Sequence, residues 1–251
     1  PAATIARVHE RLSSKLRLRV GNSWLRSSEV VYEAKELAGV LTAADLVRLD
    51  DENRQPIPKR SQDGGRWRRV LWELGAGRVG ASAAVQLLDD DADARGAKWL
   101  VNLAAAVIRD DAGDELWERS WVILTGSEER LSPATISERG MLLVHGGSGQ
   151  GLAARLKQDR PLARAFVSRR DQSAETVRKW LTDRGVLRRR PTDEDALRAL
   201  SRGDGSDPID LRTDRKLLLR VRDALDVLAP EKRHSMGPGI GKNLMLRGYS
   251  F

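Results

Sequence analysis

The segment VRKWLTDRGVLRRRPTDEDALRAL, residues 177–200, predicts two helices that are joined through a glycine and a run of arginines. Apolar residues at helical spacing precede Gly185, and glycine is the most common residue just past a helix end. Thr192 follows the arginines, and threonine is a favoured N-cap residue. We therefore expect one helix over residues 174–183 and another over residues 192–200.

A similar order of residues occurs about 110 positions earlier in the chain. Four pairs of residues correspond at this spacing: Leu71 and Leu181, Gly75 and Gly185, Arg78 and Arg188, and Ser82 and Thr192. Each copy follows an apolar stretch with a turn at Gly21 or Gly126, as in a β-hairpin. The repeat predicts an α+β fold of two tandem units, each with a short β-hairpin, a helical hairpin and a longer helix. We expect the first unit to comprise residues 1–110, and the second to comprise residues 111–251 with a C-terminal extension.

Local signals predict further elements in the first unit. Ser27, Ser28 and Glu29 are capping residues, so we expect a helix over residues 30–37. Ser82 is expected to cap a helix that reaches Leu88.

The composition indicates a folded protein with an excess of positive charge. The 251 residues include 44 basic and 36 acidic side chains, which gives a net charge of +8. This charge directs attention to nucleic acid as a partner, although arginine and acidic residues are mixed along most of the chain. The lack of cysteine excludes disulfides, thiolate metal sites and a cysteine nucleophile.

The hydropathy and the N-terminus of the sequence predict where in the cell the protein is found. No run reaches the roughly eighteen apolar residues that span a bilayer, and the N-terminus does not resemble a secretory signal. We therefore expect a cytoplasmic protein that does not contact membranes. Because the sequence starts at Pro1 rather than methionine, we also expect it to be an excised piece of a longer protein.

Two glycine-rich segments resemble nucleotide-binding motifs without completing them. Residues 145–151, HGGSGQG, lack the lysine and the hydroxyl residue of a P-loop, because Leu152 and Ala153 follow the last glycine. Residues 237–241, GPGIG, resemble a GHKL-type ATPase glycine box but lack its leading aspartate. The three histidines are too widely separated for a zinc site. We therefore expect no enzyme activity, no cofactor and no metal in this segment.

The basic residues at the two predicted helix junctions are the best binding candidates. In a nucleic-acid-binding module they would place a helix against a phosphate backbone. Alternatively, each junction is a helical hairpin whose arginines are solvated or paired with nearby acids. The candidate residues are Arg66, Arg68, Arg69 and Arg78 in the first unit, and Arg178, Lys179, Arg188, Arg189 and Arg190 in the second.

Three segments together resemble a known family. They are WVILTGSEERLSPATI (121–136), residues 177–200, and LLLRVRDALDVLAPEKRHSMGPGIGKNLMLRGYSF (217–251), and LRLRVGNSWLRSSEVV (16–31) is a looser copy of the first. This combination resembles the region behind the GHKL-type ATPase module of bacterial sacsin-like proteins, which are large chaperone-type ATPases. The family's ATPase residues have no counterpart in this sequence.

The resemblance implies a non-catalytic interaction or coupling module of a larger chaperone-like or defence-related ATPase. Its partner would then be another protein or the rest of the longer chain. The alternative is a nucleic-acid-binding module that uses the arginine-rich junctions.

Overall fold

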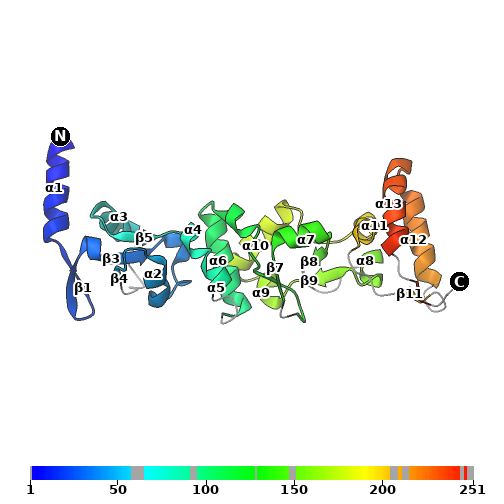
Figure 1. Ribbon diagram of the computed structural model, residues 1–251, viewed down its shortest axis with the longest axis horizontal. Helices are drawn as coiled ribbons and strands as arrows, with labels where there is room; N and C mark the ends of the chain where they lie inside the picture. Colours follow the sequence, from blue (N-terminus) through cyan, green and yellow to red (C-terminus); the bar gives the residue numbers. More distant parts are fainter. Residues whose placement is uncertain are drawn as a thin grey trace. The chain divides into compact units, whose positions relative to one another are not determined.

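The computed structural model describes residues 2–57, 65–90, 95–127, 129–146, 151–203, 209–210, 215–243 and 246–247 (Figure 1). Helices and small sheets make up both parts of the chain, so the predicted α+β class is confirmed. Two compact units are present, one of residues 1–91 and 102–113 and the other of residues 92–101 and 114–251. Residues 92–101, predicted for the first unit, belong to the second, and residues 111–113, predicted for the second unit, belong to the first.

The first unit begins with a helix and an antiparallel β-hairpin, followed by short strands and helices. Its elements are α1 (Ala2–Lys15), β1 (Arg17–Val20), β2 (Ser23–Arg26), β3 (Val30–Glu33), α2 (Ala43–Leu49), β4 (Gln55–Pro56), α3 (Gly65–Glu73), β5 (Gly77–Val79), α4 (Ala81–Ala84) and α5 (Leu87–Asp90). Helix α6 (Ala97–Arg109) has residues in both units. Short 3-10 helices lie at Ser27–Glu29, Lys35–Leu37 and Gly113–Leu116.

The second unit also contains an antiparallel hairpin, formed by β6 (Val122–Ile123) and β7 (Arg130–Leu131). The elements that follow are α7 (Pro133–Arg139), β8 (Leu142–Val144), α8 (Leu152–Arg155), β9 (Asp159–Pro161), α9 (Arg164–Val167), α10 (Gln172–Asp183), β10 (Leu187–Arg188), α11 (Asp193–Arg202), β11 (Ile209–Asp210), α12 (Arg215–Val227), α13 (Pro230–Asn243) and β12 (Leu246–Arg247).

A three-stranded parallel sheet forms in each unit, and neither sheet was predicted from the sequence. The first has the strand order β4-β3-β5 and the second β9-β8-β10, so the earliest strand is central in both. Arg78 pairs with Tyr32 in the first sheet, and Arg188 pairs with Val144 in the second. This shared order supports the predicted duplication, which stays a prediction.

The helices before β5 and β10 end in the same way. Gly75 and Gly185 have φ values of 86° and 72°, in the left-handed region that glycine adopts without strain. The amide that follows each glycine donates back to a helical carbonyl, from Ala76 to Leu71 and from Val186 to Leu181, in both cases at 2.9 Å. These bonds satisfy carbonyls that the helix leaves open.

Two local predictions for the first unit are wrong. Residues 30–37 are not one helix: residues 30–33 form the buried strand β3, because Val30, Val31 and Tyr32 are β-branched or aromatic side chains that suit a sheet. Ser82 lies inside α4 and does not cap it. The N-cap residue is Gly80, and the carboxylate of Asp110 accepts a hydrogen bond from the next amide, that of Ala81, at 3.3 Å.

The hydroxyl of Thr192 caps α11 as predicted. It accepts a hydrogen bond from the amide of Asp195 at 3.2 Å, and the Asp195 carboxylate accepts one from the Thr192 amide at 3.0 Å. This reciprocal capping box satisfies donors that the first helical turn leaves open.

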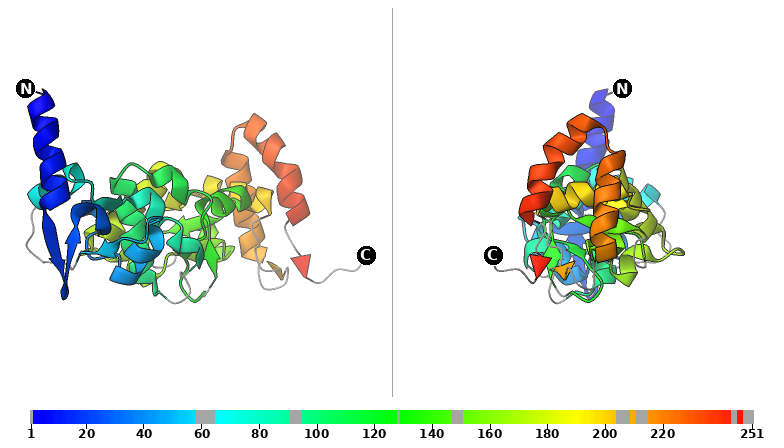
Figure 2. Two further views of the ribbon diagram at one scale, coloured as in Figure 1. Left: turned by 60° about the vertical axis from the view of Figure 1, so that its left-hand side comes forward. Right: turned by 90° about the vertical axis from the view of Figure 1, so that its right-hand side faces the viewer.

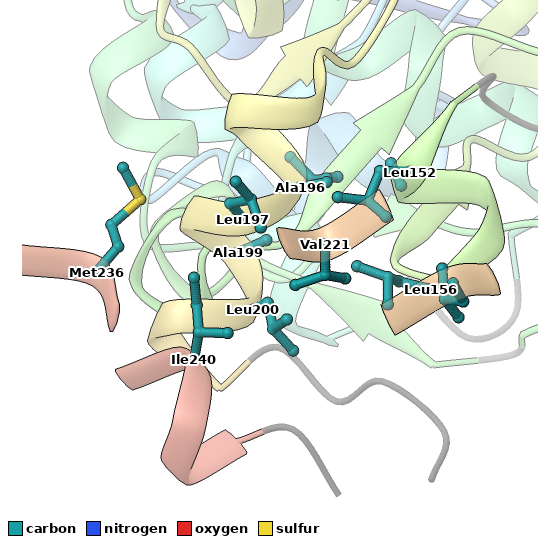
Figure 3. Packing of buried hydrophobic residues seen from close by; sticks show 12 residues of the cluster. Leu152, Leu156, Ala196, Leu197, Ala199, Leu200, Val221, Met236 and Ile240 are labelled. Atoms are coloured by element: carbon teal, nitrogen blue, oxygen red, sulfur yellow. The ribbon is translucent and has the colours of Figure 1, made fainter. Parts of the chain in front are cut away.

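Helix α11 packs against α8, α12 and α13 (Figure 2). Its buried face contributes Ala196, Leu197, Ala199 and Leu200, which point into one apolar cluster (Figure 3). The other buried members come from neighbouring elements and are Leu142, Leu152, Ala153, Leu156, Leu217, Val221, Met236 and Ile240. No helix in the described part of the chain is long and apolar enough to cross a membrane.

The glycine box GPGIG lies within helix α13. A Cβ atom on Gly239 would overlap the carbonyl oxygen of Ser201 and lie 2.6 Å from its Oγ. A Cβ atom on Gly241 would meet nothing within 4 Å. Gly239 therefore permits the close approach of α13 to α11.

We expect Gly239→Ala and Gly241→Ala to change stability in opposite directions. The clash at Gly239 should destabilise the second unit by about 1–3 kcal/mol, as overpacking of a core does. Alanine at the open position of Gly241 should stabilise the helix by up to about 1 kcal/mol. Urea denaturation of both variants measures the difference, and equal midpoints would contradict this account of the packing.

Candidate functional site

The carboxyl ends of three parallel strands meet at one edge of the second sheet. Strand β8 pairs with both β9 and β10, so residues that follow these strands come together. His145 follows β8 and Arg189 follows β10. Ligands of parallel sheets bind outside such carboxyl ends.

Helix α10 contributes two cations to the same region, Arg178 and Lys179. The guanidinium of Arg178 is half-buried and donates from Nη1 to the carbonyl oxygens of Phe166 and Ser168, at 3.0 and 3.2 Å. These bonds hold the side chain in place. The N-terminus of α10 is capped by the Asp171 carboxylate, which accepts from the amide of Ser173 at 2.9 Å.

These residues surround a cavity of about 500 Å³. Its lining residues are His145, Arg169, Glu175, Arg178, Lys179, Thr182, Asp183, Leu187 and Arg189. Four of them are cationic and two are carboxylates, so the lining has two excess positive charges before His145 is counted. An excess of fixed positive charge in a concave site attracts anions.

The same environment lowers two pKa values. Burial is the main cause of the lowered pKa of His145, and the nearby charges of Arg178, Arg189 and Arg169 lower it further. Burial also lowers the pKa of the Arg178 guanidinium. The charge of Glu175 opposes the shift of Arg178. At His145, by contrast, three arginines add to the effect of burial, and a bound anion would reduce this repulsion.

The structure separates the arginine run that follows Gly185. Arg189 lines the cavity described above, whereas Arg188 lines a second, smaller cavity beside α11 with Asp195, Arg198 and Arg202. Successive side chains of a strand point to opposite faces, which explains the separation. Arg190 is exposed and lines neither cavity.

The candidate residues of the first unit are arranged differently. Arg68 lies 3.8 Å from the buried carboxylate of Glu33. Arg69 lies 3.2 Å from the carboxylate of Glu73, which is exposed. Arg78 is exposed on β5. The side chain of Arg66 lies outside the part that the structure describes. Two of these arginines therefore have carboxylate partners, as the alternative interpretation of the junctions expects.

Arg184, which follows the end of α10, contacts the aromatic rings of Trp117 and Trp180. Its guanidinium lies 4.5 Å from the ring centre of Trp180 and 5.6 Å from that of Trp117, and it pairs with Asp114. The ring of Trp180 is also 6.2 Å from that of the buried Trp121. These contacts account for Arg184 without a ligand.

The predicted glycine-rich loop, residues 145–151, is described only at His145, Gly146 and Gly151. After Gly151 the amide of Leu152 donates to the Asp193 carboxylate at 3.0 Å. The first amide of α8 is therefore already hydrogen-bonded to a carboxylate of the chain itself.

Sequence reasoning missed the contributions of His145, Arg169 and Glu175 to the cavity. His145 enters the sequence analysis as a candidate zinc ligand and as the first residue of the glycine-rich segment 145–151, but not as a partner of the basic residues. A usable signal was its position directly after the buried strand β8, since such positions meet at one edge of a parallel sheet.

In comparisons with known proteins, no family model, no curated protein and no solved structure matches this chain. The resemblance to the sacsin-like family therefore stays a prediction.

Proposed function

We propose that this chain is a non-catalytic binding module whose second unit binds nucleic acid through its phosphates. The observation that supports the proposal is the cavity in which Arg178, Lys179 and Arg189 gather around the carboxyl ends of parallel strands. Arginine and lysine are the residues that most often contact nucleic-acid phosphates.

The charge outside the cavity favours nucleic acid over a small anion. Arg169 at the cavity and its neighbour Arg170 are exposed, and so is Arg190 beside Arg189. The whole chain carries a net charge of +8. Exposed cations around a phosphate site can contact the further phosphates of a longer polymer.

A salt titration tests the proposal. We expect the full chain to bind single-stranded DNA, with an affinity that falls steeply between about 50 and 200 mM salt. Changing Arg178, Lys179 and Arg189 together to glutamine should weaken binding and lower the slope, since each phosphate of a single strand that loses its cationic contact removes about 0.7 from it. Fluorescence anisotropy measures both quantities.

The matched control changes three exposed arginines of the first unit, Arg19, Arg69 and Arg78, to glutamine. This variant loses the same total charge, and we expect it to retain the affinity and slope of the wild type. Equal losses in the two variants would show that binding follows net charge rather than the cavity. No binding of DNA or RNA would refute the proposal, and binding of a phosphopeptide instead would identify a protein partner.

We also propose a coupling function in which the first unit contacts a protein partner or the rest of a longer chain. The observation that favours it is the exposure of two large aromatic side chains, Trp24 at 65% and Trp72 at 59%. Tryptophan is enriched at protein interfaces. The resemblance to sacsin-like proteins would make the longer chain a cytoplasmic, chaperone-like or defence-related ATPase. The parent gene tests this, because the proposal requires a GHKL-type ATPase module encoded upstream.

A further inference from the structure

We infer that the cavity receives the terminal phosphate monoester of a nucleic-acid strand rather than an internal phosphodiester. The inference rests on the proposed function and specifies its ligand. It follows from the charge of the cavity, from the order of charges along α10, and from a comparison with the first unit.

The charge of the cavity matches a monoester. A phosphate monoester carries about −1.5 to −2 at pH 7, whereas an internal diester carries one negative charge. The lining has an excess of two positive charges, from Arg169, Arg178, Lys179 and Arg189 against Glu175 and Asp183. His145, which is half-buried in the same lining, can donate a further hydrogen bond.

The order of charges along α10 leaves room for one phosphate. Arg178 and Lys179 lie in the middle of the helix, Glu175 lies one turn before them and Asp183 one turn after. Both carboxylates line the cavity. A strand that continued along the helix in either direction would bring its next phosphate towards a carboxylate, and like charges repel.

The size of the cavity agrees with a chain end. At about 500 Å³ it is in the range of sites that enclose a single small ligand, which is about 300–1,000 Å³. One side is formed by the ends of strands β8 and β10. A terminal nucleotide can enter such a concave site, whereas contacts to a continuous duplex backbone are made from exposed helices and loops.

The first unit shows how a carboxylate fills the corresponding position. Because Arg78 pairs with Tyr32 and Arg188 with Val144, the next residues along the central strands correspond, and these are Glu33 and His145. Glu33 lies 3.8 Å from Arg68, which occupies the position of Arg178 seven residues before the helix-ending glycine. The first unit thus supplies its own anion, whereas the second has a histidine there.

Three single-stranded DNAs of one sequence test the inference: one with a 5′-phosphate, one with a 3′-phosphate and one with hydroxyls at both ends. Each carries its fluorophore on an internal base, and anisotropy is measured with the full chain at constant salt. We expect one of the phosphorylated strands to bind at least about tenfold more tightly than the dihydroxyl strand, as expected for added charge-assisted hydrogen bonds. The preferred strand identifies the end that the cavity takes.

Arg189→Gln and Arg188→Gln are a matched pair for this experiment. Both side chains are exposed and adjacent in sequence, but only Arg189 lines the cavity. Arg189→Gln should reduce the preference to about onefold, while Arg188→Gln should leave it unchanged. Lys179→Gln, also exposed, provides a second variant in the cavity, and circular dichroism verifies that all three are folded.

The outcomes separate this inference from the proposed function. Equal binding of all three strands by the wild type would overturn the terminal-phosphate inference and leave nucleic-acid binding in place. No binding of any strand would overturn both. A preference that persists in both Arg189→Gln and Lys179→Gln would overturn the assignment to this cavity.

Discussion

Trp121→Ala is expected to destabilise the second unit by about 3–5 kcal/mol, the usual cost of removing a buried tryptophan. Trp121 is fully buried, and its ring lies 6.0 Å from that of Phe166. Its Nε1 donates to the carbonyl oxygen of Leu116 at 2.9 Å. The substitution leaves a cavity beside Phe166. It also leaves the buried carbonyl oxygen of Leu116 without its hydrogen-bond donor, which adds to the loss of stability. Urea denaturation followed by circular dichroism measures the loss.

Trp24→Ala is the matched control, because the Trp24 side chain is 65% exposed. Truncating an exposed side chain changes stability by under about half a kcal/mol. If both tryptophan variants unfolded at the wild-type midpoint, the aromatic cluster would not stabilise the second unit.

His145→Glu is expected to weaken binding of the preferred phosphorylated strand about a hundredfold, which corresponds to about 2.7 kcal/mol. The new carboxylate would lie near Arg178, as Glu33 lies near Arg68 in the first unit. It would neutralise one cation and repel the incoming phosphate. Two charges 4 Å apart interact by about 4 kcal/mol near a protein surface, so a hundredfold effect requires only part of that energy.

His145→Gln separates the charge of the substituted side chain from its shape. Glutamine introduces no negative charge, so the loss of affinity should stay within about tenfold, the equivalent of one neutral hydrogen bond. We expect both variants to stay folded, because His145 is only half-buried. Equal losses of affinity in the two variants would show that the carboxylate charge does not act on the ligand.

The local sequence was sufficient for the helices that surround the site. The end of α10 at Gly185 and the cap of α11 at Thr192 were both predicted, because each depends on hydrogen bonds between residues at most five positions apart. The same reasoning was wrong over residues 30–37. Capping residues precede this segment, but its first four residues are buried in a sheet, and tertiary packing outweighed the helix signal.

The sequence by itself thus determined the α+β class, the helix ends near the junctions and the richness in arginine. Only the tertiary structure decided which arginines act together. Parallel pairing of β8 with β10 brings Arg189 to the same cavity as His145, although the two residues are 44 positions apart. Strands of two or three residues are too short to show a clear periodicity in the sequence. Parallel strands are also joined by long crossovers, so the local sequence does not reveal which strands pair. The matching pairing of β3 with β5 places Glu33 where His145 lies in the second unit. Glu33 neutralises Arg68 in the first unit, whereas the second unit keeps an excess of positive charge.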